Sequence, residues 1–253
     1  MEKIISPLFL YSHFKDFFHS LVELKNLAIT ENWNLNGCNS NKILLNFILH
    51  TFSKIKQENK IVYSNSQKYS CFNTGLLTEN YENIYGFFVK NKNPNHRVNY
   101  FFLGWKKESD NDLLKFNILP DSANYFHEPS NLLYDPNLDL RVNLDHILND
   151  NYERFPEELK QKSKYEIRNN LMGAIELIKK KVKMNYKTAI PQYFNSNIQL
   201  LLPLCFSDKQ LADLALVVNK NVNFYTGRTC LTLEMAYNNA RLIARPDQEW
   251  LKV

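Results

Sequence analysis

The chain has 253 residues, of which 44% are hydrophobic and 23% charged, and its formal net charge is +5. This apolar content predicts a folded core and excludes an intrinsically disordered chain. With only 6 glycines and 9 prolines, collagen-like and low-complexity designs are also excluded. Asparagine is in excess along the whole length, which is typical of AT-rich coding bias.

The start of the chain and its hydropathy predict a soluble, cytoplasmic protein with no membrane partner. Ser6 and Pro7 interrupt the first apolar residues, and Lys15 follows soon after, which is unlike a secretory signal. The longest apolar run, Leu200 to Phe206, is far too short to span a bilayer. The cysteines have neither CxxC pairs nor histidines at zinc-finger spacing, so we expect reduced thiols, no metal and no cofactor. They are Cys38, Cys71, Cys205 and Cys230.

In chain order, the first predicted elements are helices. Apolar residues three and four apart predict one amphipathic helix from Leu8 to Leu27 and another from Asn41 to Gln57. Glu31 to Ser40 is expected to be a loop between them. From Lys60 to Trp105 the pattern changes to short aromatic and β-branched runs, which predict three or four antiparallel strands.

The middle of the chain predicts little regular structure. Residues 106–158 lose periodicity and are rich in Asp, Asn, Ser and Pro, so only a short helix near Asp145 to Asp150 is expected. A segment of this length and composition is more often functional than idle, and it marks a weak internal division.

The second half predicts a long helix, strands and a closing helix. Leu159 to Met184 has the strongest helical period, and Leu233 to Ile243 forms the closing helix, capped by Thr232. The order of elements predicts a single α+β domain over residues 1–253, with the N-terminal helices and the long helix on a mostly antiparallel mixed sheet. The strands expected between the last two helices are Asn197–Leu204, Asp213–Asn219 and Val222–Gly227.

Positive charge is concentrated in the long helix. From Lys160 to Lys187 there are nine basic and two acidic residues, so this segment carries +7 and the rest of the chain −2. A helix this basic can lie along a phosphate backbone. The alternative is a solvated face whose lysines share the codon bias of the asparagines. The candidate nucleic-acid-binding residues are Lys164, Arg168, Lys179, Lys180, Lys181 and Lys183.

Two further stretches combine glycine turns with polar residues in a pattern that an ordinary hydrophobic core does not require. Cys71 to Gly86 places a glycine directly after Asn73 and Thr74, which indicates a tight turn inside a strand pair. The alternative is an ordinary hairpin or bulge. Tyr225 to Trp250 combines a turn at Gly227 with the strand-to-helix passage that begins the closing helix.

With Leu140 to Pro156, Pro191 to Leu204, Asp213 to Val218 and the ANYF at Ala123, these stretches resemble the microbial family catalogued as domain of unknown function 3825. The resemblance runs from about Leu21 to Leu251. Family members are similar to one another as stand-alone chains or as domains joined to cold-shock-type and other RNA-binding modules, which implies a role on RNA. We expect any RNA contact of this chain to come from the domain itself.

The resemblance also implies functional roles for polar residues of this chain that lie inside otherwise apolar segments. Those assigned to substrate binding are Asn73, Thr74, Arg228, Tyr237, Arg241 and Arg245. The others are Glu79, Asp145, His146, Arg168, Gln192, Gln199 and Asn238.

Arginine matters most in this set, because its guanidinium binds phosphate through two parallel hydrogen bonds. Arg228 is expected to meet an anion near the N-terminus of the closing helix. Tyr237 and Arg241 are four apart on that helix, so a base can stack on the ring while the guanidinium holds a phosphate. The alternative is that Tyr237 fills the core and Arg241 pairs with an acid such as Asp247.

His146, preceded by Asp145, is the one candidate for a general acid or base. The alternative for this residue is a structural or surface histidine.

Three functional hypotheses follow. The first is an RNA-associated domain that binds single-stranded or end-processed RNA, with or without RNA processing, through the basic helix and a pocket formed by the Cys71 and Tyr225 motifs. The second is an enzyme acting on a phosphate-bearing nucleotide or small molecule, which requires Arg228, Arg241 and Arg245 to converge. The third is a protein-interaction scaffold, favoured if residues 106–158 are exposed and hydrophobic. The expected partner is RNA or a phosphate-bearing ligand.

Overall fold

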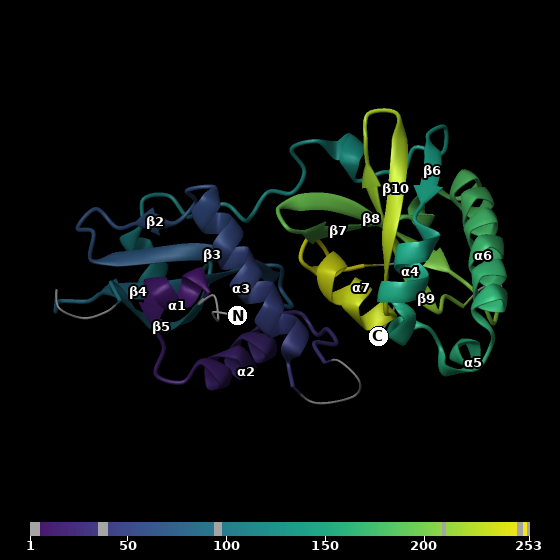
Figure 1. Cartoon of the computed structure of the whole chain (residues 1–253). Coiled ribbons are helices and arrows are strands. Elements are labelled where there is room, and N and C mark those ends of the chain that lie inside the picture. Colours follow the sequence, from purple (N-terminus) through teal and green to yellow (C-terminus); the bar gives the residue numbers. More distant parts are fainter. Residues whose placement is uncertain (1–5, 35–39, 94–97, 209–210, 247–249, 252–253) are drawn as a thin grey trace. The chain divides into compact units, whose positions relative to one another are not determined.

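The computed structural model describes residues 6–34, 40–93, 98–208, 211–246 and 250–251. The chain divides into two compact units, Met1–Asn124 and Tyr125–Val253, each with a five-stranded sheet (Figure 1). The boundary lies inside the segment 106–158. The helices and the two mixed sheets confirm the α+β class.

The sheet of the first unit has the strand order β1-β5-β4-β3-β2. β1 pairs with β5 in parallel, and the other pairs are antiparallel, as expected between Lys60 and Trp105. The strands are β1 Ser12–His13, β2 Val62–Tyr63, β3 Tyr69–Leu77, β4 Asn83–Lys90 and β5 Tyr100–Lys107.

The helix expected from Leu8 to Leu27 is a misprediction, because the structure has two helices there, α1 Pro7–Tyr11 and α2 Phe17–Leu27. Ser12 and His13 between them are extended and pair with β5. Asp16 starts α2, where its carboxylate accepts from the backbone N–H of His19. Both helices bury leucines, so apolar spacing runs through the break without revealing it.

The second expected helix is confirmed as α3 Lys42–Gln57, whose buried side chains include Phe52. The Phe52 ring meets Phe72 of β3 edge to face, with 5.0 Å between ring centroids. The opposite sheet face is covered by the short 3-10 helix η1 Asn111–Lys115 and the residues after it, through Leu113 and Phe116. Of the expected loop Glu31 to Ser40, residues 35–39 lie outside the described part of the chain.

The sheet of the second unit has the order β6-β10-β9-β8-β7, in which β6 pairs with β10 in parallel and the rest are antiparallel. The three expected strands are present, whereas β6 and β7, at the two sheet edges, were not predicted. The strands are β6 Asp139–Val142, β7 Ile190–Phe194, β8 Asn197–Leu204, β9 Leu214–Lys220 and β10 Phe224–Leu231.

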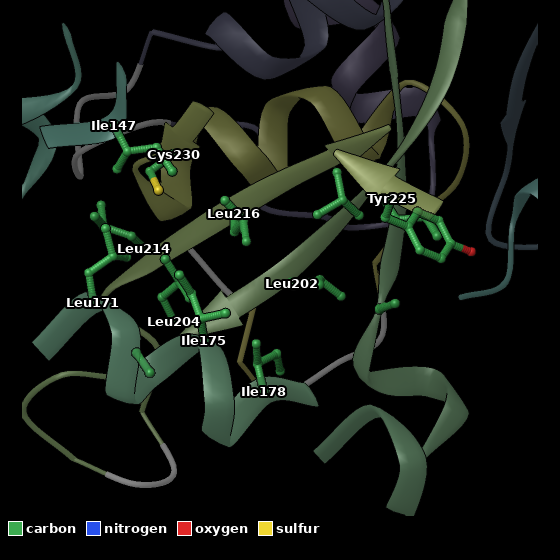
Figure 2. Close-up of a cluster of buried hydrophobic side chains, with 14 of the residues drawn as sticks. Ile147, Leu171, Ile175, Ile178, Leu202, Leu204, Leu214, Leu216, Tyr225 and Cys230 are labelled. Atoms are coloured by element: carbon green, nitrogen blue, oxygen red, sulfur yellow. The ribbon is translucent and has the colours of Figure 1, made fainter. Parts of the chain in front are cut away.

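One face of this sheet packs on α4 Leu144–Asp150 and α6 Lys164–Met184, which form the core shown in Figure 2. The strands contribute alternate residues to this core, such as Leu202 on β8 and Leu216 on β9, because successive side chains point to opposite faces. The other face carries α7 Leu233–Arg241, which packs mainly on β7 (Figure 1).

The starts of α4 and α7 agree with the prediction to within one residue, α7 ends at Arg241 and not at Ile243, and the start of α6 was predicted wrongly. α4 lies at the expected short helix, and Thr232 caps α7 as expected, accepting from the Met235 N–H. The long helix starts at Lys164, five residues later than predicted, because Ser163 and Glu166 form a capping box that ends the short helix region before it. That region contains the 3-10 helix η3 Tyr152–Arg154 and α5 Glu157–Lys160. The remaining 3-10 helices are η2 Pro129–Asn131 and η4 Tyr186–Thr188.

Candidate functional site

A cleft of about 440 Å³ opens on the α7 side of the second sheet. The strand residues in its floor all point to the same face of the sheet. Val217 and Asn219, for example, are two residues apart on β9, so their side chains lie on one face. The other residues that line it are Arg154, Gln192, Phe194, Gln199, Arg228, Thr229, Leu231, Met235, Asn238 and Asn239.

Four of the cleft's carboxamides are hydrogen-bonded in a row across the strands. Asn239 of α7 donates its Nδ2 to Gln192 Oε1 at 3.1 Å. Gln192 donates its Nε2 to Gln199 Oε1 at 2.7 Å, and Gln199 donates its Nε2 to Asn219 Oδ1 at 2.9 Å. Gln192 and Gln199 are direct partners in the register of β7 and β8, so the sheet itself places them side by side.

Arg228 reaches the cleft from an irregularity in β10. The register with β9 shifts between Gly227 and Thr229, which leaves Arg228 as the extra residue of a β-bulge. A bulge changes the direction in which a side chain points. Arg228 is exposed, and within the described chain it has no acidic partner.

A second arginine, Arg154 of η3, is held at the cleft by the backbone. Its Nη1 donates to the carbonyl of Cys230 at 2.6 Å, and the Cys230 N–H donates to Asn151 Oδ1 at 2.7 Å. No aspartate or glutamate is among the described residues that line the cleft. The cleft therefore combines two cationic groups with neutral hydrogen-bonding groups.

The predicted residues of the closing helix fall in three places. Asn238 lines the cleft, whereas Tyr237 and Arg241 are 6% and 7% exposed in the packed side of α7. Arg245 lines a separate hollow of about 220 Å³ beside Leu133 and Lys187. The structure thus does not bring Arg245 to Arg228, and Asp247 lies outside the described residues.

Asn73 and Thr74 belong to the first unit, and the cleft is lined by residues of the second unit alone. Asn73 accepts from the Gly75 N–H at 2.9 Å and donates to the Pro120 carbonyl, while Thr74 donates to the Ile84 carbonyl at 2.7 Å. Gly75 has φ +74°, and the register of β3 with β4 shifts here, so this motif forms a bulge. The Glu79 carboxylate accepts from Thr30.

His146 and Asp145 lie on α4, on the side of the sheet that faces away from the cleft. Both are exposed, and neither is among the residues that line the cleft. The Nδ1 atom of His146 contacts the carboxylate of Asp150, one turn further along the helix. Its sequence neighbour Asp145 is not its orienting partner.

The basic helix α6 also lies on the face opposite the cleft, where its apolar stripe closes the core. Lys164, Arg168, Lys180 and Lys183 are exposed. The two others are engaged: Lys179 pairs with Glu176 at 2.7 Å, and Lys181 donates to Cys205 Sγ at 3.5 Å. Lys179 and Lys183, with Arg141, also line a third hollow beside β6.

Sequence reasoning missed Asn219, Asn239, Phe194 and Arg154 as members of the site. A polar residue in an apolar strand was a usable sign for Asn219, since it follows the run from Leu214 to Val218. The others enter the cleft through strand register and helix packing, which local patterns do not contain.

The segment 106–158 exposes several large apolar side chains, among them Leu114 at 80% and Ile118 at 77%. Exposed apolar side chains in this segment are the feature that would favour the scaffold hypothesis, which stays a prediction.

Within the described residues, Cys71, Cys205 and Cys230 are free thiols, and Cys38 lies outside them. The same residues contain no cluster of three or more metal-ligating His, Cys, Asp or Glu side chains. No helix in the described ranges is both long and apolar enough to cross a membrane.

Comparison with known proteins yields a family. The model described as "Domain of unknown function (DUF3825)" matches residues 24–250, nearly the whole chain. No curated protein and no solved structure matches the chain.

Proposed function

The chain belongs to the DUF3825 family, whose description assigns no activity, and we propose that its second unit binds single-stranded RNA by holding a phosphate-bearing nucleotide in the cleft at Arg228. One observation carries this proposal. The cleft joins two arginines and five carboxamides, with no carboxylate among its described lining residues.

Each kind of lining group matches a part of a nucleotide. The guanidinium of Arg228 offers paired donors to phosphate oxygens, and Arg154 adds positive charge nearby. Carboxamides carry a donor and an acceptor and so complement base edges. Phe194 is 49% exposed at the cleft, so its ring offers a face on which a base can stack.

The lining favours binding over catalysis. Its side chains are arginines, carboxamides, a threonine hydroxyl and apolar groups, and His146 lies on the other face of the sheet. General acid–base chemistry needs a titratable group within hydrogen-bond reach of the reacting atoms. We therefore propose recognition of an RNA end or nucleotide as the function of this cleft.

The test is fluorescence anisotropy with a single-stranded RNA of about six nucleotides, with and without a 5′-phosphate. A second pair of oligonucleotides, with and without a 3′-phosphate, identifies the end. We expect the phosphate to tighten binding, and Arg228→Ala to weaken binding of the phosphorylated RNA by roughly tenfold or more, the loss of one charge-assisted contact. Arg228→Lys should recover only part, because lysine lacks the forked geometry.

Arg245→Ala is the matched control, since it removes an exposed arginine of the same unit that lines a different hollow. It should change binding by less than about twofold. Absence of binding at low salt, or equal effects of Arg228→Ala and Arg245→Ala, would contradict the proposal.

A further inference from the structure

The row of carboxamides in the cleft has a direction. Each side chain donates from its NH₂ group to the oxygen of the next, from Asn239 through Gln192 and Gln199 to Asn219. A carboxamide has one oxygen and one nitrogen, so reversing one member breaks the hydrogen bonds on both sides of it. The four side chains must therefore share one orientation, and neighbouring hydrogen bonds strengthen one another.

Burial holds the row in place. Gln192 is 1% exposed and uses both ends of its carboxamide, as acceptor from Asn239 and donor to Gln199. Leaving either atom of a buried carboxamide without a partner costs about 1–3 kcal/mol. The orientation of Gln192 is thus fixed, and the two ends of the row carry the NH₂ group and the oxygen that take no part in the hydrogen bonds of the row.

The two ends of the row are chemically opposite. At one end the Nδ2 group of Asn219 is an unused donor, and at the other the Oδ1 atom of Asn239 is an unused acceptor, within the described part of the chain. Both residues line the cleft. A bound molecule therefore meets a donor at one end of the row and an acceptor at the other.

The donor end lies on the side of the arginine. Asn219 is the register partner of Thr226 on β10, two residues before Arg228. At the other end of the row, Asn239 of α7 donates to Gln192 on β7, the strand that β8 separates from β9. Two strand spacings, about 10 Å, separate Gln192 on β7 from Asn219 on β9. Asn239 adds one more hydrogen bond to the row, so the row is long enough to run from the phosphate to the base of a nucleotide.

We propose that the carboxamide row orients the nucleotide and selects its base. The phosphate lies at Arg228 and the Asn219 donor, and the Asn239 oxygen accepts from the exocyclic amino group of adenine or cytosine. A base with a carbonyl at that position, hypoxanthine or uracil, would place oxygen against oxygen. To relieve this, the whole row would have to reverse, which would turn the Asn219 oxygen toward the phosphate.

This selection rests on the proposed nucleotide binding, and the experiment separates the two. Isothermal titration calorimetry of the full chain compares AMP with adenosine, which measures the phosphate contact. It then compares AMP with IMP and CMP with UMP, which differ chiefly by the amino-to-carbonyl exchange. We expect AMP to bind roughly tenfold tighter than IMP, and CMP tighter than UMP by a similar factor.

Gln199→Met tests whether the row acts as a unit. The substitution keeps a similar volume and interrupts the row in its middle, away from both ends. The preference for AMP over IMP should fall toward one, while AMP should still bind tighter than adenosine. Asn239→Leu, which removes the acceptor end on the partly exposed α7, should abolish the same preference if Gln199→Met fails to fold.

The outcomes are distinct. If AMP binds tighter than adenosine but no tighter than IMP, or if Gln199→Met and Asn239→Leu both keep the preference, base selection by the row is wrong and phosphate binding stands. If AMP binds no tighter than adenosine in the wild-type protein, the proposed function fails and the selection fails with it.

Discussion

His50 shows how one partly buried residue links the fold to pH. It lies on α3 in the first unit, where burial, and then the nearby charge of Lys54, lowers its pKa from 6.5 to about 4. The neutral imidazole is therefore the form that fits the folded state.

This shift predicts a loss of stability in mild acid. As pH falls below 6.5, the unfolded chain takes up a proton at His50 before the folded chain does, so the stabilisation is complete above about pH 6.5 and is lost toward pH 4. Between about pH 7.5 and pH 5 the wild-type protein should lose about 2 kcal/mol more unfolding free energy than His50→Gln. Urea unfolding at both pH values measures the difference, and parallel losses would refute the assignment.

At the scale of the element, α6 separates a structural face from a charged one. Its apolar stripe, including Leu171, Ile175 and Ile178, packs on the second sheet (Figure 2). Its lysines lie on the remaining surface. Because the cleft is on the other side of the sheet, the helix can add to RNA affinity only for a strand long enough to reach both faces.

This arrangement predicts a length-dependent effect of charge reversal. Lys180→Glu with Lys183→Glu should weaken binding of a single-stranded RNA of about 20 nucleotides and lower its salt slope by about 1.4, for two lost phosphate contacts. Binding of the six-nucleotide RNA should be unchanged. Lys15→Glu with Lys56→Glu, at exposed lysines of the first unit, is the charge-matched control. Equal effects of the two double variants would favour the solvated-face alternative for α6.

At the scale of the whole molecule, the two units have separate cores. The cluster of the second unit runs from Tyr134 to Cys230, and the cluster around Cys71 and Phe87 lies in the first. All residues that line the cleft belong to the second unit.

We therefore expect residues 125–253 to fold when expressed alone and to bind the phosphorylated six-nucleotide RNA within about twofold of the full chain. Residues 1–124 should show no binding that depends on the phosphate. Circular dichroism and anisotropy on both fragments check this. A folded second fragment that has lost phosphate-dependent binding would show that the cleft needs the first unit.

Much of the element content was predictable because its determinants are local. The apolar spacing of α3, the Thr232 cap of α7 and the apolar runs of β8 and β9 all act within a few residues. The short edge strands β1, β6 and β7 were missed, since their extended form depends on partners distant in sequence.

By itself, the amino-acid sequence determined the α+β class, most of the elements and the basic helix. Four of the polar residues singled out in the sequence, Gln192, Gln199, Arg228 and Asn238, line the cleft. Only the tertiary structure decided which of these residues meet. Strand register aligned Gln192, Gln199 and Asn219, and the packing of α7 added Asn239. Sheet alternation and helix packing placed α6 and the cleft on opposite faces, because each strand residue can face only one side.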